Sequence, residues 1–182
     1  MSAPLYEALR ALAARGDLRM HMPGHKGRLP FAPELDQAAA LDYTELAATG
    51  NLYAGGGIIG AAEALYAQSF GMAQAQFLTG GSTQGIFTAL FYAAHRGKTL
   101  LLCRGSHFSA YNACALLGLQ PRYLAQPRLS PFGCYGPVTA QSVDAALSHT
   151  PAAAVLITSP TDYGVCSDLA AIGGVCRRHG AL

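Results

Sequence analysis

Charged side chains are scarce in this sequence: Asp, Glu, Lys and Arg make up 12% of its 182 residues, against about 25% in a typical soluble domain. Hydrophobic residues make up 51%, which excludes an intrinsically disordered chain. We therefore expect a partner subunit or further protein to cover part of the surface. The formal net charge is +2 and the basic residues are scattered apart from Arg177 and Arg178, which favours neither a nucleic-acid partner nor a membrane surface.

Long apolar runs and metal-binding cysteine patterns are also missing. The longest apolar run, residues 86–94, is far shorter than the ~20 residues that span a bilayer, and the start of the chain has no basic segment followed by an apolar one. The expected location is therefore cytoplasmic. The five cysteines show no Cys-x-x-Cys spacing, which predicts neither a disulfide framework nor a metal site. We expect most of them to be small buried hydrophobic residues.

A Gly-Gly-Ser-Thr turn at residues 80–83 is the most informative local pattern. A short apolar segment at residues 76–79 precedes it and an apolar run at residues 85–94 follows it, which predicts a strand, a tight turn and a helix. We expect Ser82 and Thr83 at the N-cap of that helix, where free main-chain amides and the helix dipole suit a phosphate group. An ordinary capping turn has the same pattern, so both interpretations stay open at this point.

The N-terminal part of the chain has little regular pattern apart from two helical stretches. Residues 4–15 predict a short amphipathic helix with a glycine stop, and residues 58–70 predict a second helix. The stretch between residues 31 and 57 is rich in glycine and is expected to be mostly irregular. We therefore predict an N-terminal region of arm, loop and helix at residues 1–75.

The loop at residues 20–28 has a density of charge that is unusual for this chain. Its sequence, Met-His-Met-Pro-Gly-His-Lys-Gly-Arg, places two histidines, a lysine and an arginine around a Pro-Gly turn. This composition fits a loop that faces a ligand, and it fits a solvated turn equally well.

Residues 76–182 alternate between short apolar runs and helical stretches. The expected strands lie at residues 99–103, 122–125 and 153–158. Three helices are expected between and after them: one that begins at about His107, one that contains Val143 and Leu147, and one that is capped by Ser167. Strands that alternate with helices predict right-handed crossovers and a largely parallel sheet. Residues 179–182 are typical of a helix stop and the start of another strand, so we expect the front part of a longer protein.

Four motifs together resemble the ornithine/lysine/arginine decarboxylases, a family that uses pyridoxal phosphate. The motifs are His-Met-Pro-Gly-His-Lys at 21–26, Gly-Gly-Ser-Thr-Gln-Gly at 80–85, Arg-Gly-Ser-His at 104–107 and Thr-Ser-Pro-Thr-Asp-Tyr-Gly at 158–164. The resemblance covers essentially the whole chain. It implies an α/β fold of the aspartate-aminotransferase type, here incomplete, with a mostly parallel sheet flanked by helices and an N-terminal helical arm. It also implies a small amino-acid substrate and a homodimer or higher homo-oligomer.

The resemblance further implies five cofactor-binding residues: Gly81, Ser82, Thr83, His107 and Thr161. The family's phosphate turn coincides with the anion site expected from the residues themselves. Its ring-stacking histidine falls on His107, where an imidazole can lie flat against a pyridinium ring, with a capping histidine as the alternative. We expect His107 on the same sheet edge as Ser82. Thr161 matches a threonine that lines the cofactor pocket, whereas Asp162 stands where the family more often has an aromatic residue, which leaves the role of that turn open.

Lysine is the residue whose scarcity limits the expected chemistry. Only Lys26 and Lys98 are present, and neither matches the family's Schiff-base lysine. Lys98 precedes an expected strand, at the end of the sheet away from the ligand. The family's Asp-Glu-Ala-His and Ser-x-His-Lys stretches, which supply the acid beside the pyridine nitrogen and the lysine, are absent. We therefore expect an N-terminal fragment of a basic amino-acid decarboxylase that has no catalytic residue and is inactive on its own.

Three other interpretations remain. An aminotransferase or aldolase of the same fold would use the same cofactor, although the Pro-Gly-His-Lys loop speaks against it. A non-catalytic remnant would only fold, or bind phosphate or a partner. An unrelated nucleotide-binding α/β domain is disfavoured because the glycine turn lacks the Gly-x-Gly-x-x-Gly fingerprint. The sequence does not say which basic amino acid is the substrate.

Overall fold

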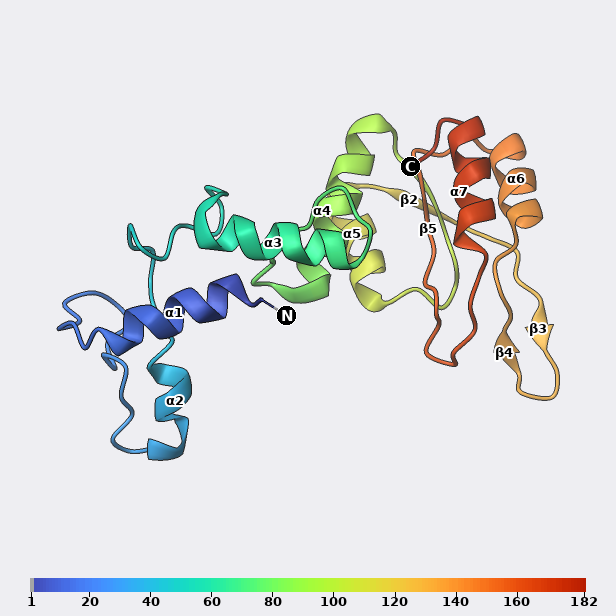
Figure 1. Cartoon of the computed structure of the whole chain (residues 1–182). Helices are drawn as coiled ribbons and strands as arrows, with labels where there is room; N and C mark the ends of the chain where they lie inside the picture. Colours follow the sequence, from blue (N-terminus) through green and yellow to red (C-terminus); the bar gives the residue numbers. More distant parts are fainter. Residues whose placement is uncertain (1) are drawn as a thin grey trace. The chain divides into compact units, whose positions relative to one another are not determined.

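The computed structural model describes residues 2–182 and divides into two compact units. Unit 1 extends to Phe77, and unit 2 is Leu78–Leu182. The helices of unit 1 are α1 (Pro4–Ala14), the 3-10 helix η1 (Pro33–Leu35), α2 (Asp36–Ala39) and α3 (Gly57–Ser69) (Figure 1). The two long helices agree with the sequence prediction. The short helical turns η1 and α2 were expected to be irregular, because their stretch has too few apolar residues to show a helical period.

Helix α1 packs against α3, and the contact is apolar. Leu5 of α1 lines a shallow groove with Leu65 of α3 and with Phe77. The amide of Phe77 donates a hydrogen bond of 2.9 Å to the Glu63 carboxylate of α3. The prediction of a strand at residues 76–79 is therefore wrong: this segment has no strand partner, and its second amide, that of Phe77, donates to a side chain instead of a ladder.

Unit 2 is built on a parallel sheet of three strands in the order β2-β1-β5. The strands are β1 (Thr99–Leu102), β2 (Gln120–Tyr123) and β5 (Ala154–Leu156). Leu100 of β1 lies opposite Pro121 on one side and Ala154 on the other. The proline is accommodated because β2 is at the edge of the sheet, where one row of amides has no ladder partner.

Helices cover both faces of this sheet (Figure 1), with α4 (Gly81–Arg96) and α5 (Phe108–Leu117) on one face and α6 (Ala140–His149) and α7 (Leu169–Arg178) on the other. Alternate residues of β1 point to opposite faces, as strand geometry requires. Leu100 and Leu102 pack among residues of α4 and α5, whereas Leu101 and Cys103 pack among residues of α6 and α7. Leu102 is fully buried, at 0% exposure. A strand covered on both faces explains the unbroken apolar run in the sequence.

Two further features complete unit 2. A two-stranded hairpin, β3 (Arg128–Leu129) with β4 (Cys134–Tyr135), occupies part of the stretch expected to be a loop. At the end of the chain, the Leu182 amide donates to Ala153 O at 3.0 Å and Leu182 O accepts from the Val155 amide at 2.9 Å. This is the hydrogen-bond pattern of a parallel ladder on the free edge of β5.

The start of α7 differs from its sequence prediction. Asp168, not Ser167, is its N-cap, and the Asp168 carboxylate accepts from the Ala171 amide at 3.0 Å. Ser167 makes long-range contacts instead: its hydroxyl accepts from the Val138 amide at 3.0 Å, and its amide donates to the Ser159 hydroxyl at 2.9 Å. A capping carboxylate is available one residue later, so the serine is free to join the loop after β5 to the start of α6.

Three of the five cysteines are buried, namely Cys103, Cys114 and Cys176, while Cys166 is exposed. Burial raises the pKa of the Cys114 and Cys176 thiols above the ordinary value. None of the helices within residues 2–182 combines the length and the apolar character that crossing a membrane requires.

Candidate functional site

The glycine turn opens helix α4, as the sequence predicts, but its cap is different from the expected one. Gly80 is the N-cap and Gly81 is the first helical residue, so Ser82 and Thr83 occupy the second and third positions. The Gln84 side chain accepts a 2.7 Å hydrogen bond from the Gly80 amide, and the Gln84 amide donates to Gly80 O. These two contacts close the turn. Among the described residues, no side chain caps the first turn of α4, so Ser82 and Thr83 do not have the capping role expected of them.

Glycine is required at position 81 because its φ is +66°, a conformation that side chains disfavour. A β-carbon there would meet nothing within 4 Å, so the space beside the turn is open. Within residues 2–182, the main-chain amides of Gly81, Ser82 and Thr83 donate to no protein acceptor, and the Ser82 and Thr83 hydroxyls are likewise unpaired. All three residues are exposed. The turn therefore presents several free donors at the positive end of a sixteen-residue helix.

His107 follows β1 and is the N-cap of α5. Its Nδ1 accepts from the Ser109 amide at 3.2 Å and lies 2.8 Å from the Ser109 hydroxyl. The capping interpretation of this histidine is thus confirmed. Since Nδ1 is an acceptor, the neutral ring carries its proton on Nε2, and two contacts to Ser109 restrict the ring's rotation. A role in stacking on a cofactor stays a prediction.

The connectivity brings the starts of α4 and α5 to one edge of the sheet. Helix α4 leads through Gly97 and Lys98 directly into the first residue of β1, so its N-terminus lies toward the carboxyl end of that strand. Helix α5 begins just after the same carboxyl end and packs against α4. Ser82 and His107 are therefore both at the carboxyl edge, where ligands bind in open α/β sheets. That the imidazole faces the glycine turn stays a prediction.

Thr161 lies in the loop that follows β5, whose carboxyl end is at the same edge. Its hydroxyl accepts from the Val165 amide at 3.2 Å, and its own amide donates to Val165 O at 2.9 Å. The Gly164 amide donates to Thr161 O at 2.8 Å. The threonine hydroxyl thus closes its own loop, and it keeps one lone pair for a ligand. Its role in lining a cofactor pocket is untested.

Sequence reasoning missed a cluster around Arg104 at this edge. The Arg104 guanidinium lies 4.2 Å from the ring centroid of Tyr123 at the end of β2, and the Tyr111 hydroxyl donates to Arg104 O at 2.9 Å. Burial raises the pKa of Tyr111 above 10.0, with smaller contributions from Tyr123 and Cys103. The available signal was an arginine two residues beyond a strand with three consecutive leucines. Tyr111 and Arg104 fix the β1–α5 loop that carries His107.

Lys98 lies away from this edge, as expected. It directly precedes β1 at the amino end of the strand, and its Nζ donates to Leu117 O at 3.2 Å. Lys26 belongs to unit 1. In the part of the chain that the structure describes, no three His, Cys, Asp or Glu side chains gather in a way that could hold a metal ion.

Comparison with known proteins agrees with the fold and the motifs. The sequence model of the Orn/Lys/Arg decarboxylase major domain matches residues 3–179. Similar proteins include the uncharacterized protein YaaO of Bacillus subtilis, 33% identical over 99% of this chain and 38% of that protein. The arginine decarboxylases of Bacillus subtilis and Bacillus anthracis are 30% and 31% identical, over 93% and 91% of this chain. The chain spans 35% to 38% of the length of these relatives.

A solved structure, that of a SepCysS–SepCysE N-terminal domain complex, is similar with a TM-score of 0.54 over 65% of this chain and 33% of that chain, at 18% identity. This likeness concerns the fold alone. The predicted fold class, an α/β domain with a parallel sheet flanked by helices, is confirmed. Because its sequence matches the family model over residues 3–179, the chain belongs to the Orn/Lys/Arg decarboxylase family.

Proposed function

We propose that this chain carries the cofactor-binding part of a pyridoxal-phosphate-dependent decarboxylase that acts on ornithine, lysine or arginine. The observation that carries the proposal is the exposed start of α4, with three consecutive unpaired amides and two unpaired hydroxyls at the carboxyl edge of the sheet. Membership of the family and the arginine decarboxylases among the relatives support it. When bound, pyridoxal phosphate supplies an electron sink for loss of the substrate carboxyl group.

The residues at the start of α4 suit the phosphate of that cofactor. The amides of Gly81, Ser82 and Thr83 would hold phosphate oxygens, and the two hydroxyls would donate further hydrogen bonds. Hydrogen bonds to a charged group contribute about 1.5–3 kcal/mol each, so a few of them suffice for micromolar binding. The open space beside Gly81 leaves the backbone accessible to the ligand.

His107 and Thr161 would position the rest of the cofactor. The imidazole is held by Ser109 and would lie against the pyridine ring, while the Thr161 loop would border the pocket on the side of β5. Arg104 adds a fixed positive charge at the same edge, which favours anionic ligands. We assign no catalytic residue to this chain, and we propose that the reacting lysine and acid come from the larger part of the family's sequence that it does not match.

We further propose that the complete protein works in the cytoplasm as a homodimer or higher homo-oligomer, and exposed apolar side chains support the oligomer. Phe31 and Phe132 are 85% and 80% exposed, and Tyr163 next to the Thr161 loop is 78% exposed. Large aromatic side chains in solvent are typical of surfaces that a partner covers.

Cofactor binding by the chain itself tests the proposal. Pyridoxal phosphate and pyridoxal, which lacks the phosphate, would each be titrated into the isotope-labelled chain while amide NMR signals are followed. We expect pyridoxal phosphate to shift the Gly81, Ser82 and Thr83 amides saturably and pyridoxal to bind at least tenfold more weakly, because the phosphate makes the contacts of the turn.

A double variant, Ser82→Ala with Thr83→Ala, should weaken pyridoxal phosphate binding about tenfold by removing two donors. Thr88→Val is the matched control, because the Thr88 hydroxyl lies on the same helix and bonds only to Gln84 O within the described chain. Equal affinity for pyridoxal and its phosphate, or shifts confined to residues far from α4, would refute the phosphate site.

A further inference from the structure

Unit 1 contains a cleft of about 860 Å³ beside the loop at residues 20–28. Volumes of this size are typical of sites for small molecules. Four of its lining side chains are basic, Arg15, Arg19, Lys26 and Arg28, against a single carboxylate, Asp17. In a chain with 12% charged residues this concentration of positive charge is unusual, and it would attract an anion.

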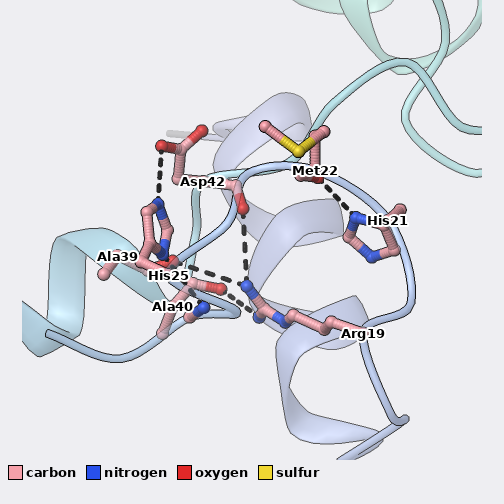
Figure 2. A network of polar contacts seen from close by, with 8 residues as sticks. Arg19, His21, Met22, His25, Ala39, Ala40 and Asp42 are labelled. Atoms are coloured by element: carbon pink, nitrogen blue, oxygen red, sulfur yellow. Dashed lines mark hydrogen bonds and ion pairs between the residues drawn. The ribbon is translucent and has the colours of Figure 1, made fainter.

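Two of the four cations are already engaged by the protein. Arg15 forms an ion pair of 2.7 Å with Asp17. The Arg19 guanidinium donates to the carbonyl oxygens of Ala39, Ala40 and Asp42, as Figure 2 shows. These carbonyls lie at the end of α2 and just beyond it, where helix geometry leaves carbonyl groups unpaired. Arg19 is therefore a structural cation that ties the loop to the segment after α2.

The same contacts make the loop a built structure. The Arg19 guanidinium lies 4.1 Å from the ring centroid of Tyr43, and it donates a 2.6 Å hydrogen bond to the Tyr43 hydroxyl oxygen. Gly27 has a φ of +83°, which favours glycine, and a β-carbon there would lie 2.6 Å from Arg19 Nη1. His25 uses both ring nitrogens, one with the Gly27 amide at 3.0 Å and one with Asp42 at 3.2 Å.

Lys26 is placed by this scaffold in a conformation that lysine disfavours. Its φ is +54°, the only positive φ of a non-glycine residue within residues 2–182. A left-handed conformation costs a side-chain-bearing residue more than glycine, and such strain tends to persist where the side chain has a use. Its Nζ donates to His21 O, which leaves two of its three N–H groups for another acceptor.

Arg28 completes the arrangement. It is exposed, it lines the same cleft, and its guanidinium has no acceptor among the described residues. Its backbone is fixed by a 3.0 Å hydrogen bond from its amide to His25 O. A guanidinium offers a planar pair of donors to an oxyanion, and an ammonium group adds a point charge beside it.

We propose that this cleft binds a small molecule through a carboxylate or phosphate group, held by Lys26 Nζ and the Arg28 guanidinium. The residues of this site belong to unit 1, whereas those of the α4 turn belong to unit 2. Arg19, His25 and Gly27 act as positioning residues that hold the loop, and the anion contacts the two cations whose donors are free.

Amide NMR of the full chain tests this site separately from the phosphate turn. Inorganic phosphate and acetate would be titrated at constant ionic strength, which keeps nonspecific screening unchanged. We expect saturable shifts of the amides of residues 24–28 with at least one probe. The double variant Lys26→Gln with Arg28→Gln should weaken that binding at least tenfold, since it removes the free charged donors.

Arg10→Gln is the control for the loss of one positive charge from unit 1. Arg10 does not line the cleft, and its guanidinium lies 5.8 Å from the ring centroid of Tyr6. This variant should leave the affinity within twofold. Lys26→Gly removes the amine without imposing backbone strain, so it reports on the charge even if the double variant folds poorly. A response to acetate alone, phosphate alone or both identifies the anion. Absence of saturable shifts at residues 24–28, or unchanged affinity in both Lys26 variants, would overturn the proposal whatever the signals of residues 81–83 do.

Discussion

Substitutions of His107 separate its capping role from its proposed contact with the cofactor ring. His107→Asn keeps a hydrogen-bond acceptor and removes the aromatic ring, His107→Phe keeps a ring and removes the acceptor, and His107→Ala removes both. In the native chain, Nδ1 accepts from the Ser109 amide at 3.2 Å. Loss of an N-cap acceptor lowers the free energy of unfolding by about 0.5–2 kcal/mol. For a unit of this size, each kcal/mol lowers Tm by roughly 4–8 °C.

Stability and ligand affinity should therefore change in different combinations. In thermal and urea unfolding, we expect the Asn variant to match the native chain and the Phe and Ala variants to be less stable by about 1 kcal/mol. In pyridoxal phosphate titrations, we expect the affinity of the Phe variant to stay close to that of the native chain. The Asn and Ala variants should bind about 2- to 10-fold more weakly, since ring stacking contributes about 0.5–1.5 kcal/mol. An Ala variant as stable as the native chain would refute the capping argument. An Asn variant with native affinity would refute the stacking argument.

Other predictions follow from burial and charge. Leu102→Ala should lower the free energy of unfolding by about 2–5 kcal/mol in urea titrations, because Leu102 is at 0% exposure and its removal leaves a cavity; a cost below about 1 kcal/mol would contradict the core assignment. The hydrogen bond from His179 holds the pKa of Asp144 below 3.8, so this contact stabilises the fold above pH 3.8 and is lost as the pH falls through the lowered pKa. His179→Gln should return that pKa toward 3.8 in a carboxyl NMR titration, and an unchanged value would exclude the histidine as the cause. In the native chain a thiol reagent should label Cys166, which is exposed, well before Cys176, whose pKa is raised by burial; mass spectrometry of timed samples would show the order, and equal rates would contradict it.

Local sequence patterns were enough to predict most elements and the start of the site. The Pro4 start of α1, the apolar run of β1 and the glycine pair before α4 each act within a few residues of their position. Proline at a first helical turn, glycine at positive φ and apolar alternation are determined by short-range sterics and solvation. The four motifs also identified the family that the comparisons show.

Side-chain partners across the chain could not be predicted in the same way. Ser167 was expected to cap α7, yet its hydroxyl accepts from the Val138 amide, 29 residues away in the sequence. A serine hydroxyl can accept a hydrogen bond from a nearby amide of its own segment or from one that folding brings close. The choice depends on which backbone amide tertiary packing leaves unpaired nearby.

The sequence by itself determined the parallel α/β fold class of unit 2, the glycine-opened helix α4 and the position of Lys98 at the far end of β1. Only the tertiary structure decided that residues 76–79 form no strand and that Arg19 holds the loop at residues 20–28 through carbonyl groups at residues 39–42. Backbone sterics and apolar periodicity act between residues that are close in sequence. A strand partner or a guanidinium site exists only when distant segments meet, so no local pattern encodes it.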